Sequence, residues 1–173
     1  MKYLLFVLLI GGFIGCRKDE EENPHIGKMV AKLNNDLGLV GMEARAFYVG
    51  VDSLLVTGGI TEDSILRWAI QFYKVPKRVG RFSFPAKDYI LPSINVGEWL
   101  DDGCVPGRSY YLPEAKESNY IEITSYNPET GDIAGRFEFT AYNSYRNAQG
   151  VRVFDLQDSM AFTNGEFSTR IRP

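Results

Sequence analysis

Histidine and cysteine are scarce in this chain of 173 residues, which has one histidine and two cysteines. His25 and Cys16 both lie near the N-terminus, so Cys104 is the only thiol of the remaining chain. Catalysis through a Ser-His-Asp or Cys-His pair requires a histidine within hydrogen-bond reach, and zinc sites use several His or Cys ligands. We therefore expect no catalytic residues of these kinds and no metal site. The sequence also lacks the GxxxxGK[ST] and GxGxxG motifs that hold nucleotides, so no cofactor is expected.

Long hydrophobic runs are missing too, except for a short one at the very start. Lys2 precedes an apolar stretch over residues 3–14, which stops at Cys16 before two basic residues and four acids. A membrane-spanning helix needs about 20 apolar residues, so this run is typical of a secretory signal peptide over residues 1–15. Its end, Phe13-Ile14-Gly15-Cys16, resembles the lipobox of bacterial lipoproteins, which implies cleavage before Cys16 and lipidation of its sulfur. The alternative is an ordinary signal peptide with a chance cysteine.

Residues 16–26 have the composition of a solvated tether, because no apolar residue follows Cys16 before Ile26. Lys18-Asp19-Glu20 resembles the signal that directs lipoproteins of Bacteroidetes type to the outer leaflet of the outer membrane. We therefore expect an outer membrane lipoprotein, with surface display and a periplasmic face both open. Removing residues 1–15 takes away Lys2 and leaves 18 basic and 22 acidic residues, a net charge of −4.

From residue 27 to residue 173 the dominant pattern is alternation with a period of two, which predicts strands. In residues 132–143, one face holds Ile133, Gly135, Phe137, Phe139 and Ala141. A second alternating run covers residues 120–126, and Asn-Pro-Glu-Thr-Gly lies between the two. The proline presets one turn dihedral and the glycine tolerates a positive φ, so the segment predicts a β-hairpin.

Further strands are expected over residues 28–33, 43–49, 53–58, 64–74, 80–84, 151–156, 160–163 and 166–171. Residues 61–74 also fit a helix capped by Thr61, but their β-branched and aromatic content favours a strand. Asn164-Gly165 indicates a turn between the last two strands. The pattern predicts one all-β domain, a single antiparallel β-sandwich or flattened barrel of about nine strands, with a lipocalin-like closed barrel as the alternative.

The stretch over residues 120–143, followed by Phe162-Thr-Asn-Gly-Glu-Phe167, resembles an uncharacterised family of small all-β lipoproteins from Bacteroidetes. The shared features are the core Ile-x-Gly-x-Phe-x-Phe-x-Ala and a closing Asn-Gly-x-Phe. The match covers mainly residues 109–171. The resemblance implies an all-β lipoprotein domain and brings no catalytic residues with it.

Residues 92–113 hold aromatic rings among several glycines and prolines, which predicts a long loop that could contact a ligand. The candidate binding residues are Trp99, Asp101, Asp102, Tyr110 and Tyr111. We expect a non-enzymatic domain that binds a glycan, a peptide or a partner protein there.

Two alternatives remain open. One is a lipocalin-like carrier of a small apolar molecule, suggested by 11 Phe and 10 Tyr on a strand pattern that could close. The other is a glycan hydrolase that uses carboxylates among Glu98, Asp101 and Asp102. Nucleic acid is not expected as a partner, because the net charge is negative and the basic residues 74–81 fit a turn.

Overall fold

Ten strands in one hydrogen-bonded sheet make up the fold. The computed structural model describes residues 26–34, 39–62, 65–84, 93–100, 105–113 and 116–172, and this part of the chain contains no helix. The predicted signal peptide and nearly all of the predicted tether lie outside these residues. The strands are β1 (Gly27–Leu33), β2 (Leu39–Tyr48), β3 (Ser53–Glu62), β4 (Ile65–Pro76), β5 (Gly80–Ser83), β6 (Ser93–Leu100), β7 (Val105–Tyr111), β8 (Tyr120–Tyr126), β9 (Asp132–Arg146) and β10 (Arg152–Arg172).

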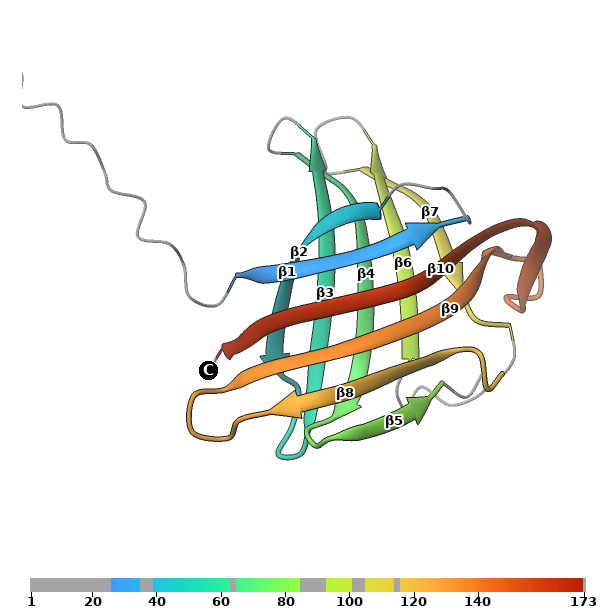
Figure 1. The fold of residues 1–173 in the computed structure, drawn as a ribbon. Helices are drawn as coiled ribbons and strands as arrows, with labels where there is room; N and C mark the ends of the chain where they lie inside the picture. Colours follow the sequence, from blue (N-terminus) through green and yellow to red (C-terminus); the bar gives the residue numbers. More distant parts are fainter. Residues whose placement is uncertain are drawn as a thin grey trace, which may run out of the picture.

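The sheet closes into a ring. Antiparallel ladders connect β1, β2, β3, β4, β6, β7, β9 and β10 in that order, and β10 pairs again with β1. β8 and β5 extend the sheet from the first part of β9. Figure 1 shows the ring flattened into two layers, with β1, β10, β9, β8 and β5 crossing steeply in front of β2, β3, β4 and β6. The all-β prediction is therefore confirmed, with ten strands where about nine were expected.

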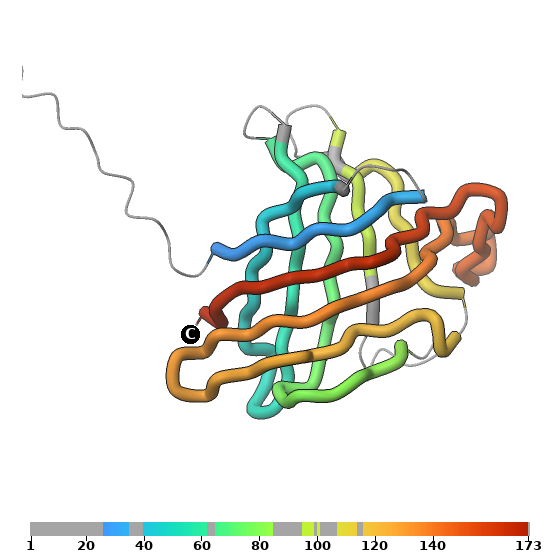
Figure 2. Tube along the Cα trace, in the orientation of Figure 1, coloured from blue at the N-terminus to red at the C-terminus, as the bar shows by residue number. Residues whose placement is uncertain are grey.

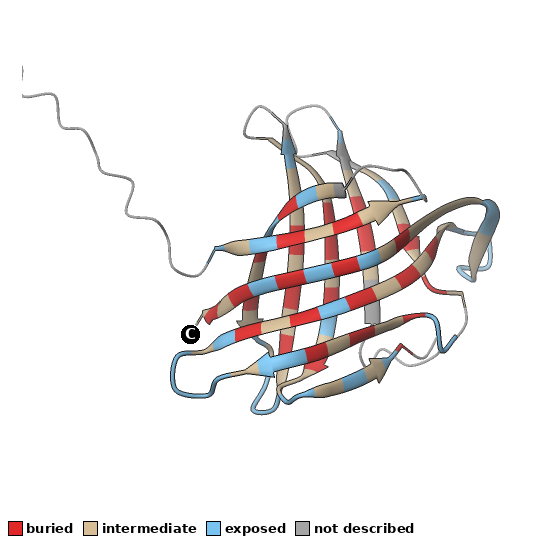
Figure 3. Cartoon of the chain, viewed as in Figure 1, coloured by how far each residue is buried: buried red, intermediate tan, exposed pale blue. Residues whose placement is uncertain are grey.

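The predicted hairpin of residues 120–143 is present as β8 and β9. Gly131 has a φ of 75° in the turn, and the Asn127 and Gly131 amides close it with backbone hydrogen bonds of 2.9 Å. Figure 3 shows the alternation of buried and exposed residues along β9. The predicted inward face is buried throughout: Ile133, Gly135, Phe137, Phe139 and Ala141. The strand predicted over residues 64–74 is also present, as β4.

The turn predicted at Asn164-Gly165 is wrong. β10 continues through this point as one strand of 21 residues (Figure 2). Its pairing with β9 shifts by one residue there, because Phe162 faces Phe139 whereas Gly165 faces Phe137. Asn164 has a φ of 50°, so the conformation that suggested a hairpin turn is accommodated in a β-bulge instead. The strand predicted over residues 151–156 belongs to β10 as well.

The long loop predicted over residues 92–113 is also wrong. β6 and β7 form an antiparallel hairpin there, with Asn95 opposite Tyr111 and Leu100 opposite Val105. The register shifts between Gly97 and Trp99, close to Pro106, so the proline sits where the ladder is already irregular. Glycine and proline are thus tolerated inside this hairpin rather than marking a loop.

Aromatic rings from both layers pack together in the interior. Phe72 on β4 has ring centroids 5.8 Å from Phe84, 5.0 Å from Phe137 and 5.7 Å from Phe139. Phe139 in turn stacks on Phe162 at 4.9 Å. All five residues are at most 2% exposed, so these rings form the packed centre of the core.

Candidate ligand-binding site

An apolar cavity of about 290 Å³ lies inside the fold, beyond the packed phenylalanines. Every residue that lines it is apolar: Leu33, Val40, Met42, Ile60, Trp68, Ile70, Val96, Met160 and Phe162. Leu33 ends β1 and Val40 lies at the start of β2, which places the cavity at the upper end of the ring in Figure 1. Both layers therefore contribute side chains to one apolar hollow.

The lining divides into a closed floor and an accessible rim. Met42, Ile70, Val96 and Phe162 are buried, at 7% exposure or less. Leu33, Val40, Ile60, Trp68 and Met160 are only partly buried. The cavity thus deepens toward the core and opens at the end of the ring, which is the shape of a small-molecule pocket.

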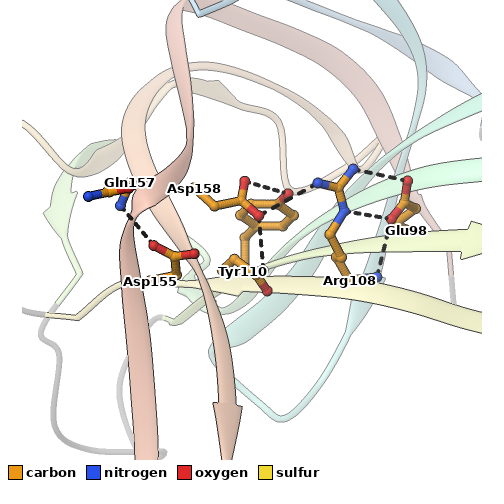
Figure 4. Close-up of polar contacts among 7 residues, drawn as sticks. Glu98, Arg108, Tyr110, Asp155, Gln157 and Asp158 are labelled. Carbon is orange, nitrogen blue, oxygen red and sulfur yellow. Dashed lines mark hydrogen bonds and ion pairs between the residues drawn. The ribbon is translucent and has the colours of Figure 1, made fainter.

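A cluster of polar and charged side chains lies on β6, β7, β9 and β10 (Figure 4). Arg108 Nε donates a hydrogen bond to Glu98 Oε2 at 3.0 Å, and the Arg108 amide donates to the same oxygen at 3.2 Å. On its other side the guanidinium faces Asp158 Oδ2, with Nη1 at 3.6 Å. Tyr110 Oη donates to Asp158 Oδ1 at 3.0 Å, and Asn143 Nδ2 donates to Asp158 Oδ2 at 2.9 Å. We call Glu98, Arg108, Tyr110, Asn143 and Asp158 the polar cluster.

The strand register places the polar cluster next to the cavity. Glu98 is directly opposite Trp68 in the β4–β6 ladder, and Tyr110 is directly opposite Val96 in the β6–β7 ladder. Opposite residues share a face of the sheet, and both Trp68 and Val96 line the cavity. The Trp68 and Tyr110 rings lie 6.2 Å apart between centroids.

β10, which contributes Asp158 to the polar cluster, also borders the cavity. Asp158 precedes the cavity residue Met160 by two positions on β10, and alternate residues of a strand lie on one face. The polar cluster therefore borders the rim of the cavity.

Burial and charge pairing control protonation in the polar cluster. Burial, together with the hydrogen bond to Asp158, raises the pKa of Tyr110 to about 12, so this phenol is neutral at physiological pH. The hydrogen bond from Arg108 lowers the pKa of Glu98, which keeps this carboxylate ionised. Glu98 in return raises the pKa of Arg108. With two carboxylates and one guanidinium, the polar cluster has a net charge of −1.

The sequence-predicted site residues are only partly brought together. Tyr110 is 2% exposed and belongs to the polar cluster. Tyr111 lies on the other face of β7, where the Arg152 guanidinium stacks 3.4 Å from its ring centroid. Trp99 lies in β6, but its side chain is outside the described residues, as are Asp101 and Asp102. Binding of a glycan, a peptide or a partner protein at these positions stays a prediction.

Arg108 and Asp158 were missed by sequence reasoning. Their signal was positional, because Arg108 is two residues before Tyr110 and Asp158 is two before Met160, on inward faces. These inward positions could be recognised only if β7 had been predicted as a strand and β10 as one continuous strand. Charged residues at inward positions within strands were the features to look for.

The chemistry of Glu98 does not suit the proton-donor role in the hydrolase alternative. A glycosidase needs one carboxylic acid that stays protonated, with its pKa raised. The pKa of Glu98 is lowered instead, since Arg108 stabilises its charged form. Glu98 is therefore suited to electrostatic binding and poorly suited to proton donation.

Comparisons of the chain with family models, with curated proteins and with solved structures find no match. Within the described residues, no group of three or more His, Cys, Asp or Glu side chains could hold a metal ion. The same part of the chain contains no helix of the length and apolarity that a membrane crossing requires.

Proposed function

We propose that this chain is a lipid-anchored envelope protein whose β domain binds a small, largely apolar molecule without transforming it. The observation that carries this proposal is the apolar cavity between Trp68 and Met160, which has a closed floor and an open rim. Among the functions considered from the sequence, the carrier is the one that this cavity supports best. Binding of a glycan, a peptide or a partner protein would use an outer surface and leave the cavity without a role.

The volume limits the size of the ligand. An apolar cavity of about 150 Å³ admits a molecule such as benzene, so 290 Å³ suits a ligand with roughly 12 non-hydrogen atoms. At roughly 0.5 kcal/mol for each such atom, the binding free energy is about −6 kcal/mol, which corresponds to a Kd of about 40 μM. We therefore expect a small ligand that is bound reversibly.

The anchoring part of the proposal is supported by the N-terminal residues. The lipobox-like ending at Cys16 and the charged residues after it favour a lipidated cysteine at the membrane. The first strand of the described residues begins at Gly27, directly after the predicted tether of residues 16–26. We place the protein at the outer membrane, with the membrane as its partner through lipid.

A cavity-filling substitution tests the binding proposal. The chain from residue 16 onward, with Cys16→Ala, contains every described strand and can be titrated with the neutral fluorescent dye 1-naphthylamine, which is small enough for the cavity. Ile60→Trp adds a large ring at the cavity rim, so we expect dye binding to weaken at least tenfold. The matched control is Val79→Trp, because Val79 is 62% exposed and is not among the cavity residues.

Unchanged dye binding in Ile60→Trp, with a normal melting transition, would show that the cavity is not the binding site. Native mass spectrometry of the protein purified from its own host adds a second measurement. A carrier should retain a bound molecule there, and that molecule should be absent from the Ile60→Trp variant.

A further inference from the structure

We infer that the cavity takes an amphiphile whose polar head is an amine or a hydroxyl, and that it discriminates against carboxylates. This inference rests on the proposed binding function and concerns the head group alone. Its basis is that the wall beside the cavity rim is a polar cluster with net negative charge.

The head group of a ligand in the cavity would contact the polar cluster, because the polar cluster borders the rim of the cavity. A chain that enters between Trp68 and Met160 leaves its outer end beside the residues that neighbour these two on the inward faces, Glu98 and Asp158. The exposed fraction of the side chain is 17% for Glu98 and 32% for Asp158. Both carboxylates are thus shielded from bulk solvent but still reachable.

The net charge of the polar cluster favours a cation or a neutral hydrogen-bond donor at the cavity rim. Arg108 is the only cation of the polar cluster, and it faces Glu98 on one side and Asp158 on the other. Tyr110 adds no charge, since its hydroxyl hydrogen is donated to Asp158. An ammonium group would bring the local net charge from −1 to zero, whereas a carboxylate would bring it to −2.

The hydrogen-bond count points the same way. Two carboxylates offer about eight acceptor positions, while the hydrogen bonds that they accept from the described residues number five. Three of these come from Arg108 to Glu98, and Asp158 receives one each from Tyr110 and Asn143, besides its ion pair with Arg108 at 3.6 Å. The remaining acceptor positions fit an ammonium or hydroxyl donor. A carboxylate head has no hydrogen to donate to them.

Three ligands with the same chain and different heads test this inference: decylamine, decanol and decanoate. Each is tested for displacement of 1-naphthylamine from the Cys16→Ala chain at concentrations where it stays dissolved as a monomer, at about pH 8, where the alkyl amine and the acid are both ionised. We expect decylamine to bind most tightly, decanol next, and decanoate at least tenfold more weakly than decylamine.

A variant that neutralises one carboxylate of the polar cluster tests whether its charge causes the head-group preference. Glu98→Gln changes the net charge from −1 to zero, so the ratio between decylamine and decanoate should fall at least threefold. Asp158→Asn should act in the same direction and serves if Glu98→Gln does not fold. The matched control is Glu122→Gln, which removes a carboxylate paired with Arg136 at 3.4 Å. Glu122 lies between the buried Ile121 and Ile123 on β8, so it is on the outward face of the sheet, and it is not among the cavity residues.

The outcomes separate this inference from the proposed function. If all three ligands displace the dye equally, or decanoate binds best, the head-group inference is wrong and the cavity function stands. If none displaces it, the proposed function itself fails. Decylamine must also lose binding in Ile60→Trp, because attraction of the amine to an acidic surface would survive that change.

Discussion

At the residue scale, two glycines allow phenylalanine rings to pack directly over the backbone of the neighbouring strand. A Cβ atom on Gly165 would lie 2.4 Å from the Phe137 ring, and one on Gly135 would lie 2.6 Å from the Phe167 ring. The Gly135 position also approaches the Glu122 carbonyl oxygen at 2.3 Å. The glycine in the Ile-x-Gly-x-Phe pattern of β9 is therefore explained by the Phe167 ring that covers it.

Alanine at Gly165 should destabilise the fold. The added methyl group has to displace the Phe137 ring, which is 1% exposed and touches Phe72 and Phe139. Overpacking of this kind costs about 1 to 3 kcal/mol of unfolding free energy, measurable in denaturant melts. Gly41→Ala is the control, because its Cβ would meet nothing within 4 Å. Equal stability of the two variants would mean that the Phe137 ring is not packed as described.

At the scale of elements, β10 connects the strands on either side of it and closes the ring. β10 pairs with β1 and with β9 along its length, and its residue Asp158 receives hydrogen bonds from Tyr110 on β7 and Asn143 on β9. Since the direct β7–β9 ladder contains only the pairs at Tyr110 and Tyr111, these side-chain bonds reinforce a short junction.

The tyrosine of this junction should be visible in a pH titration. Burial and the hydrogen bond to Asp158 raise the pKa of Tyr110 to about 12, above the value near 10 of an unfolded chain. Its contribution to stability is complete below about pH 10 and is lost as the pH rises through about 12. Ultraviolet difference absorbance should show a late ionisation step that Tyr110→Phe removes. Tyr145→Phe, which removes a tyrosine that is 62% exposed, should leave that step in place.

The elements that could be predicted from the sequence were those with uninterrupted alternation. The residues of β8 and β9 alternate without a break, and the turn between them has unambiguous chemistry, so both strands and the buried face of Phe137 and Phe139 were predicted. β6 and β7 were missed because Gly97, Pro106 and Gly107 interrupt their pattern. The course of β10 was missed because a bulge and a turn share the signal Asn-Gly.

The candidate site was less predictable than the strands. Its cavity depends on which side chains fail to fill the space between the two layers, and that is a property of the three-dimensional packing. Tyr110 was singled out as an aromatic residue, but its partners Arg108 and Asp158 are 50 residues apart in the chain. Only the closure of the ring brings them together.

At the scale of the whole molecule, anchoring is the property that the N-terminal sequence predicts. Cys16→Ala should move the full chain from the membrane fraction to the soluble fraction and abolish labelling by a fatty acid, because the proposal assigns the lipid to this one sulfur. Cys104→Ala is the control and should leave both unchanged. A Cys16→Ala protein that stays with the membrane would refute the anchoring proposal.

The direction of β1 determines how such an anchored protein would acquire its ligand. β1 begins at Gly27, where the tether joins, and ends at Leu33 on the cavity rim, so about 20 Å separates attachment from opening. The opening is then presented on the side remote from the point of attachment, so hydrophobic cargo would arrive through water or from another protein. Such a molecule would work as a relay between a soluble donor and an acceptor, held within a fixed radius of the membrane by its tether.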